Sequence, residues 1–147
     1  MKILIISVGK QNDANFNEAI NDYSKRISRY FSVEWKLIPS SDKERESESI
    51  LKVLNGGDFV VALDDKGKEL NTIELSEFLE KRMVSSNKRV AFVIGGAYGI
   101  GEKVQEAANF KWSLSKLTFP HQLARLILVE SIYRAISVTK NEPYHHA

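Results

Sequence analysis

The sequence of 147 residues contains no cysteine, so it can form neither a disulfide framework nor a thiolate metal site. Its apolar runs are also much shorter than the roughly 18 residues that a membrane-spanning helix requires. The first run, Lys2–Val8, is too short for a secretory signal and is followed by no small-residue cleavage site, so we interpret it as a buried strand. We therefore expect a cytoplasmic protein with no membrane partner.

Histidine is scarce, and neither sign of charge dominates. The three histidines and the scattered carboxylates show no spacing typical of metal ligands, so we predict that the protein holds no metal. No Ser-His-Asp set or nucleophile elbow is apparent. The net charge of +2 is too small to indicate a nucleic-acid-binding protein by itself, although it leaves such a partner open.

Strand-like apolar runs alternate with amphipathic helical segments along the whole chain. This order is typical of an α/β fold with a mostly parallel sheet and helices on both faces. No linker or repeat divides the chain, so we expect one domain over residues 1–147. The expected strands are Lys2–Val8, 33–37, Phe59–Leu63, Arg89–Ile94 and Lys111–Leu117, and the expected helices are 13–30, 41–54, one capped by Thr72, 102–108 and 121–139.

Three local predictions concern the ends of these elements. Asn12 or Asp13 can cap the first helix, and Ser41–Glu44 resembles a capping box for the second. We interpret the charged run Asp42–Glu48 as a solvent-facing surface. The polar stretch Asp64–Lys68 is expected to form a loop after the third strand.

Two of the expected strands end in irregular loops. The run Val90–Ile94 breaks into the glycine-rich segment 95–101, and Lys111–Leu117 breaks into the segment 118–121, which contains proline. Ligands of open α/β sheets bind just beyond the carboxyl ends of strands. We therefore predict that the two loops form two walls of one pocket.

The glycine-rich loop does not match the known phosphate-binding patterns. Its spacing differs from the dinucleotide pattern, and although Gly96 and Gly101 have the Walker spacing, Glu102 and Lys103 follow where lysine and serine or threonine are required. A carboxylate at that position would oppose a phosphate. The loop better suits a ligand that backbone groups and shape recognise, and a plain strand-to-helix turn is the alternative.

The last expected helix is apolar around most of its circumference, which indicates burial on several sides. A partner subunit could supply this cover, and we favour a homodimer over deep burial within one chain. Glu130 and Arg134 are spaced to pair with each other. His121, at the helix start, could contact a ligand or be structural, and the tail 144–146 could be frayed or could face an anionic substrate.

Several of these motifs together resemble one known family. The chain is similar, from end to end, to the RlmH (YbeA) family of the SPOUT superfamily. The matching motifs are Val8-Gly9-Lys10, Ile94-Gly95-Gly96-x-x-Gly99, Leu114–His121, Arg125, Glu130, Tyr133-Arg134-Ala135 and Tyr144-His145.

The resemblance implies a homodimer that transfers methyl from S-adenosylmethionine, without a metal, to N3 of a pseudouridine in helix 69 of 23S rRNA. It also implies a trefoil knot at the C-terminal end and the assembled ribosome as substrate. The positions that it implies for methyl-donor contacts lie at three strand ends. They are Leu63, Gly95, Leu114, Ser115, Lys116, Leu117, Thr118 and Phe119.

On the substrate side, the resemblance implies catalytic roles for three residues, one of them as acceptor of the N3 proton. They are Glu130, Tyr144 and His145. Arg125 and Arg134 would hold a phosphate or the anionic base. The family has a basic residue after Tyr-His, whereas His146 stands here, so we expect a more pH-sensitive contact with the substrate.

Two other functions stay open at this point. One is a SPOUT-like methyltransferase that acts on another RNA, such as tRNA. The other is a non-catalytic dimeric module that binds a nucleotide or the ribosome.

Overall fold

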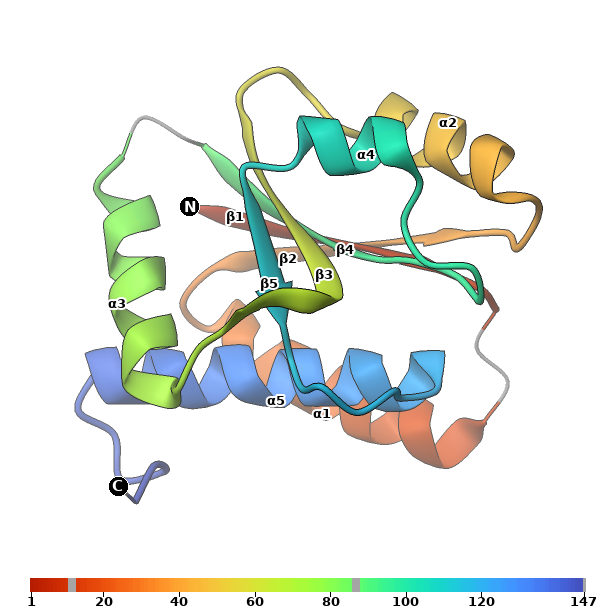
Figure 1. Ribbon diagram of the computed structural model, residues 1–147. Helices are drawn as coiled ribbons and strands as arrows, with labels where there is room; N and C mark the ends of the chain where they lie inside the picture. The colour runs from red at the N-terminus through yellow and green to blue at the C-terminus, as the bar shows by residue number, and fades with distance from the viewer. Residues whose placement is uncertain (11–12, 86–87, 147) are drawn as a thin grey trace.

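Five parallel strands form one sheet in the computed structural model, which describes residues 1–10, 13–85 and 88–146 (Figure 1). The strand order is β2-β1-β4-β3-β5. The strands are β1 Lys2–Val8, β2 Ser32–Ile38, β3 Asp58–Glu69, β4 Arg89–Ile94 and β5 Phe110–Ser113. The helices are α1 Ala14–Ser28, α2 Lys43–Val53, α3 Thr72–Met83, α4 Glu102–Ala107 and α5 His121–Thr139. The predicted α/β class is confirmed.

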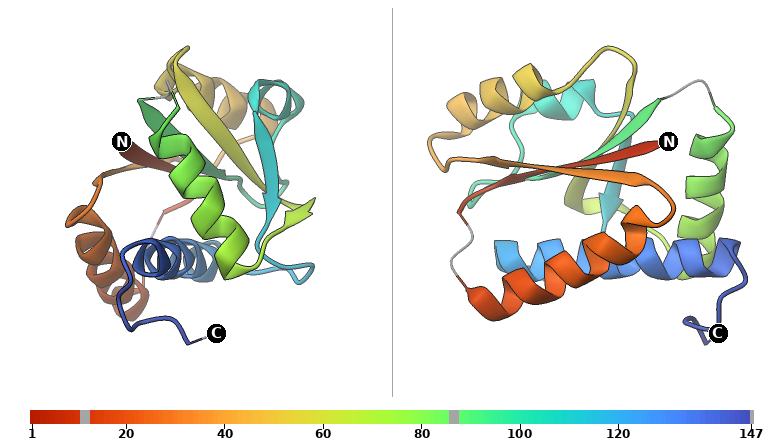
Figure 2. Two further views of the ribbon diagram at one scale, coloured as in Figure 1. Left: turned by 90° about the vertical axis from the view of Figure 1, so that its left-hand side faces the viewer. Right: turned by 180° about the vertical axis from the view of Figure 1, so that it is seen from behind.

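The helices form a layer on each face of the sheet. α1, α3 and α5 lie on one face, and α2 and α4 lie on the other (Figure 2). β1 and β4 are covered on both faces, which explains why their sequences are nearly continuous apolar runs. Alternate side chains of these strands enter two separate cores, with Ile3, Ile5 and Phe92 in one and Leu4 and Ile6 in the other.

α5 lies against the first of these cores and between two neighbouring helices. It packs on α1 and α3 as well as on the sheet, and the two helices α1 and α5 run side by side in Figure 2. Leu128, Ile132 and Ile136 are fully or almost fully buried, whereas Leu123 and Ile127 are half-buried. Contacts within one chain therefore account for much of the apolar surface of this helix.

The structure corrects two predicted strand boundaries. β3 continues to Glu69, so the expected loop Asp64–Lys68 belongs to the strand, where the pairing with β5 shifts between Leu63 and Lys68. Gly67 lies so close to β5 that an added Cβ would be 2.6 Å from the Lys111 carbonyl oxygen. β5 ends at Ser113 instead of Leu117, and the Ser113 hydroxyl donates to the Ser115 carbonyl in the turn that follows.

Helix caps also differ in part from the predictions. Asp13 caps α1, and the alternative cap, Asn12, lies outside the described residues. Asp42, not Ser41, caps α2, because its carboxylate accepts the Arg45 backbone N–H. The cap of α3 is Asn71 instead of Thr72.

The predicted solvent-facing run on α2 contains one clear exception. The side chain of Glu46 is buried, with 4% of its surface exposed, and its Oε2 accepts the Ser41 backbone N–H at 2.9 Å. Ser47 is also buried, against the backbone of Gly101. α2 therefore packs on the loop that follows β4.

Among the described residues, no helix combines the length and apolar character needed to cross a bilayer.

At the amino-terminal edge of the sheet, an ion pair connects β3 and β4. Arg89 donates from Nε and Nη2 to the two carboxylate oxygens of Asp58 at 2.9 and 2.7 Å. Burial alone would raise the pKa of Asp58, but the hydrogen bonds from Arg89 and from the Asn55 backbone N–H hold it below its usual value.

A lowered pKa in the folded state makes this pair a source of stability that acid removes. We expect Asp58→Asn to lower the free energy of unfolding by about 3 kcal/mol at neutral pH, because Arg89 loses its buried partner. The difference from the wild-type chain should shrink as the pH falls below about 4, where Asp58 is protonated in the unfolded and then in the folded chain. Urea denaturation from pH 3 to 7 measures this, and a difference that does not change with pH would contradict it.

Candidate functional site

A cleft of about 300 Å³ lies at the carboxyl ends of β4 and β5, beside the bulge of β3. Three segments line it: the bulge of β3 after Leu63, the loop after β4, and the segment between β5 and α5. The lining includes most of the positions predicted for the methyl donor, namely Leu63, Gly95, Leu114, Ser115, Leu117, Thr118 and Phe119. Lys116 is not among them, since its ammonium points outward and lies 3.7 Å from the Glu69 carboxylate.

The glycine-rich wall depends on close approaches of the backbone. A Cβ added to Gly95 would lie 2.8 Å from the Gly99 carbonyl carbon and from Ile100 Cγ1. The Gly99 N–H donates to the Gly96 carbonyl at 3.0 Å, and Gly99 has a positive φ of 80°. The loop therefore folds back on itself as a narrow turn and presents backbone to the cleft.

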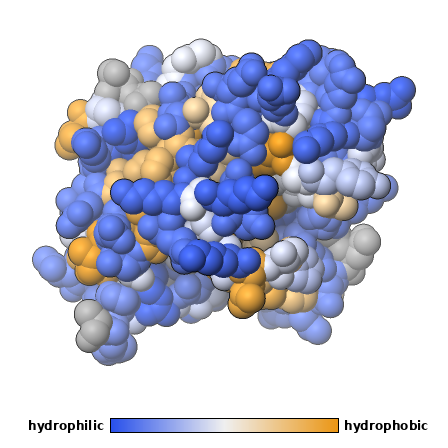
Figure 3. All heavy atoms as spheres, in the orientation of Figure 1, coloured by the Kyte–Doolittle hydropathy of each residue, from blue (hydrophilic) through white to orange (hydrophobic). Residues whose placement is uncertain are grey.

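The opposite wall is formed by the segment 114–120. The Leu117 N–H donates to Ser115 Oγ at 3.0 Å, which tightens the chain just before it enters α5. Leu117 is 72% exposed. Figure 3 shows a small hydrophobic patch over this segment, with other hydrophobic patches elsewhere on the same face. This wall thus combines a hydrogen-bonded turn with apolar side chains.

The cleft is also lined by two carboxylates that the sequence analysis did not single out. Asp64 and Asp65 lie in the β3 bulge, and the lining contains no lysine, arginine or histidine. Asp64 accepts the Lys66 backbone N–H at 3.0 Å and a longer bond of 3.4 Å from Gln105 Nε2. An acidic lining is unsuited to phosphate, in agreement with the glycine spacing. The position of this acidic pair directly after a buried strand was the sequence signal that could have placed it at the cleft.

Arg125 occupies a different place from the one predicted. Its side chain is fully buried, and its guanidinium donates to Ser7 Oγ at 2.6 Å and to the Gly9 carbonyl at 2.7 Å. Burial lowers the pKa of this arginine. No carboxylate among the described residues is within ion-pair distance of it. Because the guanidinium points into the protein, this position argues against the predicted substrate contact and gives Arg125 a role in holding α5 on β1.

The other predicted residues gather around Glu130. Its Oε1 accepts from Arg134 Nε at 2.8 Å and from the Tyr144 hydroxyl at 3.2 Å. The Tyr144 hydroxyl also lies 2.9 Å from that of Tyr23 on α1, and Arg134 Nη1 lies 3.4 Å from His145 Nδ1. The predicted pairing of Glu130 with Arg134 is therefore present, and the tail is packed on α1 and α5 instead of being frayed.

These contacts set the protonation states in the network. Burial raises the pKa of Tyr144, and the Tyr23 hydroxyl and the Glu130 carboxylate raise it further, so Tyr144 is a neutral phenol at physiological pH. The Glu130 carboxylate raises the pKa of Arg134. His146 lies beyond the network and is exposed.

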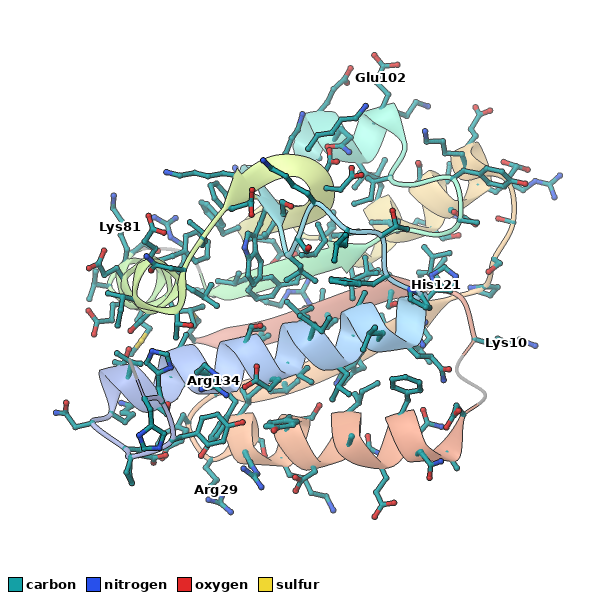
Figure 4. The ribbon with its side chains drawn as sticks, turned by 60° about the horizontal axis from the view of Figure 1, so that its bottom comes forward. Lys10, Arg29, Lys81, Glu102, His121 and Arg134 are labelled. Carbon is teal, nitrogen blue, oxygen red and sulfur yellow. The ribbon has the colours of Figure 1, made fainter. Side chains whose placement is uncertain are left out.

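The cleft and the tail network lie on different turns of α5, since the tail folds back to Glu130 in the middle of the helix. Ala124, in the first turn, lines the cleft, whereas the tail follows Thr139 at the other end. Glu130 and Arg134, which hold the tail, follow Ala124 by roughly 9 and 15 Å along the helix axis. Figure 4 shows the labelled His121 and Arg134 toward opposite ends of this helix. Within one copy of the chain, none of the described tail residues 144–146 is part of the cleft lining.

A family model described as a predicted SPOUT methyltransferase matches residues 1–145. The chain belongs to the SPOUT methyltransferase family. Similar curated SPOUT relatives include proteins of Parabacteroides distasonis and Bacteroides thetaiotaomicron, which are 47% and 43% identical over 99% of this chain and of each relative. Both are named ribosomal RNA large subunit methyltransferase H.

Solved structures with this SPOUT fold are much less similar in sequence. A probable methylase family protein from Haemophilus influenzae is 14% identical, with a TM-score of 0.60 over 99% of this chain and 70% of its own. The SpoU methyltransferase AviRb from Streptomyces viridochromogenes, solved with AdoMet, is 10% identical, with a TM-score of 0.50 over 96% of this chain and 59% of its own. Both likenesses concern the fold.

The close approach at Gly95 predicts a specific cost for a methyl group at that position. We expect Gly95→Ala to destabilise the protein by about 2 kcal/mol, because the new Cβ displaces the Gly99 backbone. Gly56→Ala is the matched control, since a Cβ there meets nothing within 4 Å. Thermal denaturation of both variants compares them, and equal melting temperatures would contradict the tight turn.

Proposed function

We propose that the protein is a cytoplasmic rRNA methyltransferase that methylates N3 of a pseudouridine in helix 69 of 23S rRNA on the assembled ribosome. The observation that carries the proposal is the three-walled cleft between the β3 bulge and the carboxyl ends of β4 and β5 in a SPOUT methyltransferase. The names of the full-length relatives support an rRNA of the large subunit as the substrate.

S-adenosylmethionine is the donor that fits this cleft. It carries no phosphate, and the lining offers backbone of Gly95, apolar side chains such as Leu63 and Phe119, and no basic group. The fold likeness to AviRb, solved with AdoMet, supports the same donor. When bound, the donor supplies an electrophilic methyl group. Leu63, Gly95 and the segment 114–119 would hold it, with Lys116 at the outer side of that segment.

The reaction needs a group that takes the N3 proton. As the methyl carbon bonds to N3, its bond to sulfur breaks, the electron pair stays on sulfur, and the N3 proton passes to a base. Glu130, Tyr144 and His145 are the candidates. A neutral Tyr144 can donate a hydrogen bond to the target base but cannot accept its proton at neutral pH. We therefore assign proton acceptance to His145 or Glu130. Arg134 would bind the anion, with His146 at the rim of the site.

The separation along α5 leads to a two-subunit site. Since residues 144–146 are not part of the cleft lining of their own chain, we infer a homodimer in which the tail of each subunit completes the cleft of the other. Such a dimer would also cover the half-buried Leu123 and Ile127 on α5. We also propose that the chain forms a trefoil knot at its C-terminal end.

Loss of the gene should remove one modification from the ribosome. We expect nuclease digestion and mass spectrometry of 23S rRNA from a deletion strain to show the unmethylated pseudouridine, with methylation restored by the wild-type chain and not by Gly95→Val. If the pseudouridine in helix 69 of 23S rRNA is still methylated in the deletion strain, the assignment is contradicted. Loss of a methylated nucleoside from tRNA instead would favour the other RNA substrate, and a failure of the pure protein to bind S-adenosylmethionine in calorimetry would favour a non-catalytic module.

Mixed dimers test the shared site. We expect Gly95→Val and a chain that lacks residues 144–147 to be inactive alone, because one lacks the cleft and the other the tail. A heterodimer of the two should recover about half of the wild-type activity, since one site is intact.

The matched control carries both changes in one subunit beside a wild-type partner. That heterodimer should be inactive, because each site then lacks one part. The reverse pattern, with an active control and an inactive mixed dimer, would show that each subunit works with its own tail.

A further inference from the structure

A buried carboxylate stands directly behind the glycine-rich wall of the cleft. Glu46, on α2, is 4% exposed, and its Oε2 accepts the Ser41 N–H. Its Oε1 has no hydrogen-bond partner among the described residues. A Cβ added to Gly96 would lie 2.8 Å from this Oε1, so the carboxylate contacts the backbone of a residue that lines the cleft.

The other side of the cleft is acidic as well. Asp64 and Asp65 line it from the β3 bulge, and no positive side chain of the described residues is part of the lining. The nearby cations are directed elsewhere: Lys116 toward Glu69, and Arg125 toward Ser7 and the end of β1. The cleft therefore carries an excess of negative charge on two of its walls.

We propose that Glu46, Asp64 and Asp65 make the cleft selective for a cationic sulfonium ligand over the neutral thioether that methyl transfer leaves behind. This inference rests on the proposed methyl donor and adds specificity-determining residues to it. Opposite charges attract strongly where water is excluded, and the attraction to the sulfur disappears when its charge does. The same carboxylates thus favour entry of the donor and exit of the product.

The three carboxylates should differ in their response to salt. Asp65 is exposed, so its attraction is screened over about 8 Å at physiological ionic strength. Glu46 is buried behind Gly96 and is screened much less. Its contribution should therefore persist in salt that suppresses the contribution of Asp65.

The test compares the affinities for two ligands that differ in the sulfonium charge. Calorimetry measures the Kd of S-adenosylmethionine and of S-adenosylhomocysteine for the full chain and for Glu46→Gln and Asp65→Asn. Glu48→Gln is the control, because Glu48 lies on the same helix but is exposed. The isosteric Glu46→Gln keeps an acceptor for the Ser41 N–H, and thermal denaturation reports whether each variant is folded.

We expect the preference for the sulfonium, as the ratio of the two affinities, to fall about fivefold in Glu46→Gln and about threefold in Asp65→Asn, with no change in Glu48→Gln. Raising the salt should abolish the Asp65 effect and spare the Glu46 effect. Parallel weakening of both ligands at an unchanged ratio would show a purely structural role and overturn the inference while leaving the methyl donor in place. If the wild-type chain binds neither ligand, the proposed function itself fails.

Discussion

The attachment of α5 to the end of β1 by Arg125 is the interaction on which the site depends. A fully buried guanidinium donates to Ser7, near the end of β1, and to Gly9, the first residue after it. Removing a charge from water is costly unless hydrogen bonds replace its hydration, so these bonds fix the position of the first helical turn. The segment 114–120 leads directly into that turn, and the wall that it forms is thereby held opposite the glycine-rich loop.

Charge is divided along the molecule in a way that matches a two-part reaction. The cleft end of α5 is acidic and presents backbone, which suits a cationic donor without phosphate. The tail region carries Arg134, which is paired with Glu130, and also His145 and His146, which offer contacts to an anionic RNA. Within one chain, none of the described tail residues 144–146 lines the cleft. A second copy of the chain is the simplest way to bring them together.

Sequence patterns predicted most of the fold because apolar periodicity reports burial. The seven residues of β1 and the whole of α5 were predicted with their observed bounds, since both are long and strongly apolar. The bulge of β3 was not predicted, because the polar residues Asp64 and Asp65 are typical of a loop. The pairing of this part of β3 with β5 depends on the close approach of the two strands at Gly67. The sequence did not predict the burial of Glu46 either, since only the packing of α2 on Gly96 removes its side chain from water.

The central claim is that the cleft between Gly95 and the segment 114–119 holds the methyl donor. A crystal structure of the protein with S-adenosylmethionine tests it most directly. The account predicts the ligand between these two walls, with its sulfonium on the side of Asp64 and Glu46. Density for the ligand at the opposite edge of the sheet, in the hollow beside Lys2 and Arg89, would contradict it.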